Sequence, residues 1–260
     1  MNQEKTAESL GTVARVIALL RLMAESHNDL TLTVLSEKLG LAPSTIHRLL
    51  ALLIKEGLVG RNPVTKTYFC AAEFVRISSL VVSSSQLVDL AVPVLQSLVD
   101  QFNETSLLCL YLEQQQRYTI SKVIHGTHLL RYDIRENTPL PLAWGASARS
   151  ILAFLPQAEI DDILASSGPS QVSGDPIDER THADLALTRK RGYAYTPGQR
   201  VAGSVGLGAP VFGANRKVVG SVCITVPQTR FDPKQEKTLG AALIEHAARL
   251  SRSLGYVMPE

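Results

Sequence analysis

The sequence predicts the α+β fold class, with a winged helix-turn-helix at the N-terminal end and a domain of strands and helices after it. Residues 12–57 carry apolar side chains at helical spacing in three stretches, the last two separated by a tight turn. Residues 58–70 alternate apolar and polar side chains around a turn sequence, which is typical of a hairpin. From Thr105, strand-like runs, helical runs, more strand-like runs and a last helical run follow, which indicates a sheet with helices segregated from it.

The composition indicates a soluble chain of one or two domains. The 260 residues are 45% hydrophobic, yet no apolar run is long enough to span a membrane. The N-terminal stretch lacks the basic and then apolar order of a secretory signal, and the cysteines are odd in number and far apart: Cys70, Cys109 and Cys223. We therefore expect a cytoplasmic protein. Its formal net charge of +2 permits nucleic-acid binding without requiring it.

Two helices are predicted before the first tight turn. The first begins at Thr12, because apolar side chains form one stripe at helical spacing: Val13, Val16, Ile17, Leu20 and Ala24. The second lies in the stretch TLTVLSEKLG, which offers threonine caps at its start and two apolar residues four apart, Leu35 and Leu39. Gly40 suits the left-handed residue that ends a helix.

A third helix is predicted from Pro43, directly after that turn. Proline suits a first helical turn, and a core stripe then follows at Ile46, Leu49, Leu50 and Leu53. Two helices joined by so short a turn, with another packed behind them, form the helix-turn-helix pattern, whose second helix enters the major groove with its N-terminal residues at base edges. The candidates for base contact are the polar residues at those positions: Ser44, Thr45, His47 and Arg48.

The stretch LVGRNPVTKTYFC predicts a hairpin, or wing, because apolar and polar residues alternate around Asn62-Pro63. The wing carries two cations, Arg61 and Lys66, that we expect to contact DNA phosphates. Residues 31–70 hold five cations and two anions, an excess of three positive charges that can neutralise phosphate. The alternative is a plain three-helix unit whose polar face is merely solvated. The agreement of helix order, polar residue types and a basic wing favours DNA binding.

The segment after the wing predicts a helical linker over residues 71–86. Its pattern is helical, but the run Ser83 to Ser85 interrupts it, and Pro93 should break or kink the helix that follows. The linker's apolar residues could serve either in plain packing or in a dimer contact: Phe74, Ile77, Leu80 and Val81. The expected domains are therefore residues 1–70, the linker 71–86, and residues 87–260.

The remainder of the chain predicts an antiparallel meander, then helices, then further strands. The first strand-like runs are TSLLCLYLEQ, RYTISKVI and HLLRYDI. Helical runs follow in WGASARSILAFL, PQAEIDDILA and DERTHADLALTRKRG, and the next strand-like runs are YAY, SVGLGAPVF and KVVGSVCITV. A last helix is expected from about Asp232.

Catalytic motifs are weak in this second part. Ser147 in GASAR lacks the second glycine of a nucleophile elbow, and GSVGLG lacks the features of a phosphate-binding loop. The histidines and cysteines show no zinc-ligand spacing. We therefore expect no catalytic residue, no metal and no cofactor. A small-molecule enzyme or a pure interaction module, each with an accessory DNA-binding domain, remains the alternative.

The sequence resembles the isocitrate lyase regulator (IclR) family of bacterial transcription factors from about Thr12 to Leu254. The resemblance rests on the stretches TVARVIALL, LTLTVLSEKLGLAPSTIHRLLALLIKEGLV, LAVPVLQSLVDQFNETSLLCL, LPLAWGASARSILAFLP, TRKRGYAY and GSVGLGAPVFGANRKVVGSVCITVP. It implies a winged helix-turn-helix joined by a linker helix to a GAF-like α+β effector-binding domain. It also implies a homodimer or tetramer that binds a double-stranded DNA operator and responds to a small-molecule effector.

The resemblance places the effector between the sheet and the helix that starts near WGASAR. The residues that match the family's effector site, with two walls of the pocket, are Ala146, Ser147, Thr196, Gly206, Cys223 and Thr225, and Tyr132 and Leu140. Relatives commonly have a histidine, a pair of acids and a cysteine where this chain has Ala143, the stretch 196–199 and Gly206. The pocket should therefore be roomier and less polar.

An organic acid is the expected effector. The helix start near Gly145 presents unpaired backbone N–H groups that favour a carboxylate, and Ser147 can add a hydroxyl. A bulky or aromatic body is one option because Trp144 is adjacent, although core filling explains Trp144 almost as well. The sequence does not name the effector, the operator, the direction of regulation or the choice between dimer and tetramer.

Overall fold

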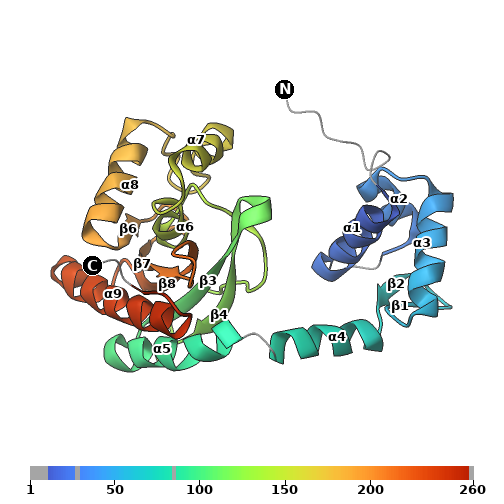
Figure 1. The fold of residues 1–260 in the computed structure, drawn as a ribbon, viewed down its shortest axis with the longest axis horizontal. Helices are drawn as coiled ribbons and strands as arrows, with labels where there is room; N and C mark the ends of the chain where they lie inside the picture. The colour runs from blue at the N-terminus through green and yellow to red at the C-terminus, as the bar shows by residue number, and fades with distance from the viewer. Residues whose placement is uncertain (1–10, 27–29, 84–85, 258–260) are drawn as a thin grey trace. The chain divides into compact units, whose positions relative to one another are not determined.

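The chain divides into two compact units, residues 1–85 and residues 86–260 (Figure 1). A computed structural model describes residues 11–26, 30–83 and 86–257. Each unit has its own hydrophobic core: one cluster fills the first unit, and two clusters lie on either side of the sheet in the second.

The first unit contains three packed helices and a two-stranded hairpin. The helices are α1 (Thr12–Glu25), α2 (Leu32–Leu39) and α3 (Pro43–Lys55), followed by β1 (Val59–Arg61), β2 (Tyr68–Cys70) and α4 (Ala72–Ser83). Thr31 caps α2 by accepting a hydrogen bond from the Val34 amide at 3.4 Å, and Gly40 ends the helix with a left-handed φ of 62°. The predicted positions of these helices and of the hairpin are confirmed.

The predicted core stripe of α1 is correct only in part, since Val16 and Leu20 pack against the core and other members do not. Val13 is 74% exposed and Ile17 is 51% exposed, whereas Leu19 and Met23 are buried. Apolar residues occupy more than one side of α1, so their spacing is compatible with two different buried faces. Contacts of α1 with α2 and β2 select the face through Leu19.

The helix after the linker runs through its proline. Helix α5 (Gln86–Phe102) contains Pro93, so the predicted break there is wrong. Pro93 and Asp89 both lie on the exposed side, where water can bond the carbonyl that the proline ring leaves free. The buried side, through residues such as Leu95, stays packed on the sheet. Residues 84 and 85 and the side chains of Leu80 and Val81 lie outside the part of the chain described.

The second unit is built on a six-stranded antiparallel sheet with the strand order β5-β4-β3-β8-β7-β6. The strands are β3 (Thr105–Leu112), β4 (Arg117–Ile124), β5 (Leu140–Pro141), β6 (Ala194–Pro197), β7 (Ser204–Phe212) and β8 (Val218–Pro227). Helices α5 and α9 (Glu236–Ser253) cover one face, and α6 (Ala146–Leu152), α7 (Gln157–Ser166) and α8 (Glu179–Arg191) lie over the other (Figure 1). Helices segregated from an antiparallel sheet confirm the predicted α+β class.

The run HLLRYDI is a loop, which corrects the predicted third strand of the meander. Leu129 is fully exposed and Leu130 is 64% exposed, so the pair contributes nothing to a sheet face. Side-chain hydrogen bonds anchor this loop in place of strand pairing: Asn103 Oδ1 accepts from the Thr127 amide at 2.8 Å, and the Tyr132 hydroxyl donates to the Gly203 carbonyl at 2.6 Å. The strand that pairs with β4 is β5, through Leu140 and Pro141.

Candidate functional site

Helix α3 separates an apolar face from a polar one. Its four predicted core residues are buried: Ile46, Leu49, Leu50 and Leu53. Ser44, His47 and Arg48 are exposed at the start of the helix, and Thr45 is half-buried. Within the described residues, these four polar side chains make no hydrogen bond or ion pair, so their donors and acceptors face solvent. The predicted base-contact candidates therefore share one accessible surface, which we call the α3 face.

The turn before α3 fixes the helix against α2. The amide of Leu41 donates to the Ser36 carbonyl at 3.2 Å, and the Ser36 hydroxyl donates back to the Leu41 carbonyl at 2.5 Å. Gly40 occupies the left-handed region, and nothing lies within 4 Å of the position its Cβ would take. Backbone geometry, rather than crowding, requires glycine at this turn.

The wing presents its two cations at exposed positions. Asn62 Oδ1 closes the turn by accepting from the Val64 and Thr65 amides at 2.9 and 3.2 Å. The Arg61 guanidinium lies 5.6 Å from the centroid of the Tyr68 ring, and the exposed Lys66 has a left-handed φ of 61°. Both side chains are free to contact an anionic surface.

The second unit contains a cavity of about 310 Å³ between the sheet, the start of α6 and two loops. It lies on the sheet face that α6 covers, and the loops are residues 132–138 and 200–204. Seven of the eight predicted effector residues line it: Tyr132, Leu140, Ala146, Ser147, Thr196, Gly206 and Thr225. The fold therefore brings residues from distant parts of the sequence together around one cavity.

Cys223 is the exception, because it does not line this cavity. It lies on the same sheet face as Thr225, two residues away on β8, but beneath α6. A Cβ placed on Gly208 would lie 2.8 Å from the Cys223 sulfur and 2.9 Å from Ser150 Oγ, so the thiol is closed in by strand and helix. Packing against Ser150 and the neighbouring strand explains the burial of Cys223.

Trp144 and Ala143 also lie away from the cavity lining. The Trp144 indole donates to the Gly168 carbonyl at 3.0 Å, and its ring packs against Arg149, whose guanidinium carbon lies 5.3 Å from the ring centroid. Trp144 thus fills the helical layer. It does not wall the cavity as one option had suggested.

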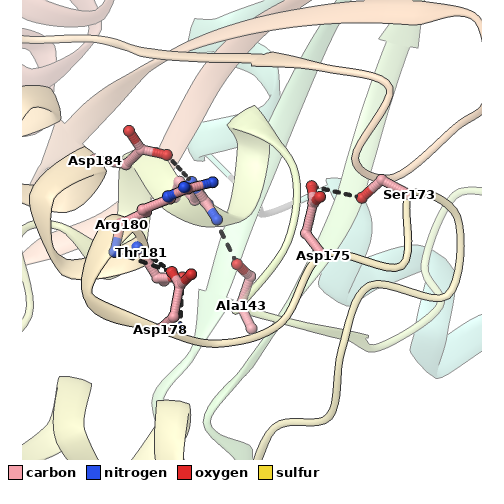
Figure 2. Close-up of polar contacts among 8 residues, drawn as sticks. Ala143, Ser173, Asp175, Asp178, Arg180, Thr181 and Asp184 are labelled. Atoms are coloured by element: carbon pink, nitrogen blue, oxygen red, sulfur yellow. Dashed lines mark hydrogen bonds and ion pairs between the residues drawn. The ribbon is translucent and has the colours of Figure 1, made fainter.

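A buried arginine of α6, Arg149, holds this helix in place through contacts with Asp184 and Ala143, which are both labelled in Figure 2. Arg149 is 3% exposed, forms an ion pair with Asp184 of α8 at 2.7 Å, and donates to the Ala143 carbonyl at 3.4 Å. Burial lowers the pKa of this guanidinium, and Asp184 opposes the shift. Asp178 caps α8 nearby by accepting from the Arg180 and Thr181 amides. These contacts fix the helix whose first turn forms one wall of the cavity.

Sequence reasoning missed the charged residues of the cavity. Arg135, Arg200 and Asp133 line the cavity. All three lie in loops, outside the helices and strands. The Arg200 side chain packs on Gly145, where an added Cβ would lie 3.0 Å from Arg200 Cβ. No periodic pattern marks such a residue, because its position depends on how residues 198–204 fold across the start of α6.

Residues 11–26, 30–83 and 86–257 contain neither a candidate metal site nor a candidate membrane-spanning helix. No group of three or more His, Cys, Asp and Glu side chains there could hold a metal ion. No helix in the same residues has the length and apolar character of a membrane span.

Known families match both units. A model of the bacterial transcriptional regulator IclR C-terminal domain matches residues 79–252, and a model of the IclR helix-turn-helix domain matches residues 12–63. The transcriptional repressor IclR of Escherichia coli K12 is 26% identical over 255 residues, which cover 96% of this chain and 93% of that protein.

Solved structures share the fold over nearly the full chain. An IclR transcriptional regulator from Alicyclobacillus acidocaldarius superposes with a TM-score of 0.83 at 20% identity, covering 95% of this chain and 100% of that one. An IclR homologue from Microbacterium hydrocarbonoxydans, complexed with 4-hydroxybenzoate, gives a TM-score of 0.77 at 18% identity and covers 94% of this chain and 99% of that one.

Proposed function

Because the chain belongs to the IclR family of bacterial transcriptional regulators, we propose that its α3 face reads an operator sequence under the control of a small organic acid. The protein is a regulator with a helix-turn-helix DNA-binding domain, and its matched relatives are repressors and regulators rather than enzymes. The observation that carries the first half of the proposal is the set of unpaired polar side chains at the exposed start of α3.

Base contacts and phosphate contacts fall to different residues in this proposal. Ser44, Thr45, His47 and Arg48 meet base edges in the major groove, since the N-terminal part of the second helix takes that place in helix-turn-helix proteins. Arg61 and Lys66 meet phosphates from the wing. An arginine can bond a guanine edge with two donors, and such a contact contributes about 1–3 kcal/mol of discrimination.

The test compares Arg48→Ala with Lys66→Ala on an operator selected from source-genome fragments and on random duplex. Arg48→Ala should reduce binding to the operator by about tenfold or more and leave random duplex little changed. Lys66→Ala should weaken both DNAs by similar factors and make binding less dependent on salt. Equal binding of the unmodified protein to operator and random duplex would refute sequence-specific reading.

The effector half of the proposal rests on the cavity of the second unit. Its volume of about 310 Å³ lies at the small end of the range for small-molecule sites, which favours a compact ligand. Apolar walls such as Ile120 and Leu140 would cover the body of the ligand, and Ser147, Thr196 and Thr225 offer hydroxyls. Arg135 and Arg200 outnumber Asp133 among the charged lining residues, which favours an anion. The homologue that holds 4-hydroxybenzoate supports this class of ligand.

Thermal melting tests the effector class directly, because a ligand of the folded state raises its stability. Benzoate, 4-hydroxybenzoate and short aliphatic acids should stabilise the protein more than their neutral amides do. An effector should also change DNA binding by its different affinity for two states of the protein. Stabilisation by the amides that equals stabilisation by the acids would exclude an acid effector.

We further propose a cytoplasmic homodimer or tetramer with a DNA-binding domain in residues 1–70, a linker in 71–86 and an effector domain in 87–260. Paired domains would place two α3 helices about one helical turn of DNA apart. Exposed apolar residues of α4 support a contact between copies, with Val75 57% exposed and Ile77 42% exposed. A monomer in light scattering at micromolar concentration, with and without DNA, would contradict the assembly.

A further inference from the structure

Arg200 extends along the start of α6 into the cavity. Its Cβ and Cδ would lie 3.0 and 3.2 Å from a Cβ on Gly145, so its stem lies directly on that glycine. Its guanidinium carbon lies 5.4 Å from the centroid of the Tyr118 ring, which is fully buried. An aromatic ring and a glycine thus hold this cation at the cavity wall.

The backbone on both sides of Arg200 is fixed. The Gly198 amide donates to the Ser204 carbonyl at 2.7 Å, and the Ser204 hydroxyl donates to the Val201 carbonyl at 2.7 Å. The Ser170 hydroxyl donates to the Gln199 carbonyl at 2.8 Å, which ties this segment to the loop before α8. A cation on a fixed backbone can bind a ligand without first losing much conformational freedom.

Arg200 differs from the other arginines that the second unit shields from solvent. Over residues 86–257, four arginines are buried or half-buried, and three of them pair with carboxylates. Arg149 pairs with Asp184 at 2.7 Å, Arg191 with Glu236 at 3.6 Å, and Arg230 with Glu104 at 2.6 Å. Arg200 has no such ion pair among the described residues, although it is also half-buried.

A partly desolvated guanidinium without a carboxylate is an unsatisfied donor set. Arg200 lines the cavity beside apolar walls, so a ligand in the cavity can supply the missing anion. We propose that Arg200 binds the carboxylate of the effector and determines the preference for acids. This inference rests on the proposed control by a small molecule and adds the residue that recognises its charge.

The test measures the affinity of the full chain for benzoate and for benzamide by calorimetry. Arg200→Met keeps an apolar stem against Gly145 and removes the charge, so benzoate affinity should fall about tenfold or more while benzamide affinity stays unchanged. Arg200→Lys keeps the charge and should retain part of the preference for benzoate. Arg252→Met, at an exposed position in α9, is the matched control and should bind both probes like the unmodified protein.

Unchanged benzamide binding in Arg200→Met shows that the cavity still folds. Equal affinity of the unmodified protein and Arg200→Met for benzoate would overturn the inference, and so would a loss of benzoate affinity in Arg135→Met alone. The absence of benzoate binding to the unmodified protein would overturn it too. Control of DNA binding by a small molecule would survive each of these results if a neutral ligand changed DNA binding, although the organic-acid part of the proposed function would not. It would fail if no ligand changed DNA binding.

Discussion

The α3 face and the cavity handle positive charge in opposite ways. Arg48 is exposed on a single helix, where water solvates the guanidinium until DNA replaces that water. Arg200 is half-buried against Gly145 and Tyr118, where less of its surface is open to water than at Arg48. A surface that meets a polyanion can carry unpaired cations at little cost, whereas a cavity that senses one small molecule leaves few charges unpaired. The unpaired charge in the cavity is therefore the more informative of the two.

The two regions also differ in how they are assembled. The polar residues of the α3 face span Ser44 to Arg48, and one turn and one helix orient them. The cavity brings together the loop 132–138, the start of α6 near Ala146, the segment 196–206 and Thr225. A change in any one of these segments can alter the cavity, while the α3 face depends on the packing of a three-helix core.

The largest expected effect comes from separate damage to the two cores. Ile46→Ala should lower the free energy of unfolding of the first unit by about 2–5 kcal/mol, because Ile46 is fully buried beneath the α3 face. Leu152→Ala, at a fully buried position of α6, should cost the second unit a similar amount. Calorimetric melting, operator binding and benzoate binding report on each variant.

The two variants should fail in different assays. Ile46→Ala should lose operator binding and keep benzoate binding, and Leu152→Ala should do the reverse at a temperature where each damaged unit has melted. Loss of both activities in either variant would mean that the two units are not independent in stability.

The difference in assembly decides what the sequence could predict. The core stripe of α3, its exposed polar residues and Gly40 follow from spacing along one helix and one turn, and all are where the sequence placed them. Residue spacing gave wrong predictions where a helix carries apolar residues on two faces, because spacing does not show which face is buried. Ile17 in α1 is exposed because tertiary contacts chose the other apolar face. Pro93 does not break α5 because the Asp89 carbonyl, which the proline ring leaves without an N–H donor, belongs to the exposed side of the helix.

The cavity was predictable only in part. Resemblance to a family located lining residues such as Ser147 and Thr196, but periodicity alone located none of them. Cys223 matches the family's site, yet α6 and Gly208 close it off from the cavity. Arg200 lies in an irregular segment whose direction depends on hydrogen bonds to residues far along the chain, such as Ser170. Such placement is a property of the folded structure, not of a local pattern.

A glycine-to-alanine pair compares the two regions at intermediate effect. Gly40 is left-handed, with φ 62° and ψ 31°, where alanine is strained by about 1–2 kcal/mol. Gly145 has φ 87° and ψ 157°, a region that is essentially restricted to glycine, where alanine is strained by about 1–3 kcal/mol. Nothing lies within 4 Å of a Cβ on Gly40, whereas a Cβ on Gly145 would lie 3.0 Å from Arg200 Cβ. Gly145→Ala should therefore destabilise its unit more than Gly40→Ala does and should also weaken benzoate binding by displacing Arg200.

Urea unfolding of both variants gives the two stability losses. Gly40→Ala should leave benzoate binding unchanged, which makes it the matched control. If Gly145→Ala binds benzoate like the unmodified protein, Arg200 does not depend on close packing against this glycine.

The smallest expected effect is a pH dependence confined to the second unit. His125 begins the loop that leads to the cavity, and its Nδ1 lies 3.2 Å from the Thr105 hydroxyl. Burial, aided by Arg131, lowers the pKa of His125, and Asp133 and Glu136 oppose the shift. Between the lowered folded pKa and the unfolded value of about 6.5, the unfolded chain binds more protons than the folded one. The stability of the second unit should therefore decline as pH falls through this window.

His125→Gln should reduce this decline, because glutamine does not titrate and can still hydrogen-bond Thr105. Urea unfolding at about pH 7.5 and about pH 5.5 brackets the window, since an ordinary histidine titrates near 6.5. His182→Gln, at an exposed position of α8, is the control and should leave the decline in place. A decline of the same size in His125→Gln would assign it to other groups. The burial that lowers the pKa of His125 is confined to the second unit. If the stability of the first unit fell by the same amount between these two pH values, the pH dependence would not distinguish the two units.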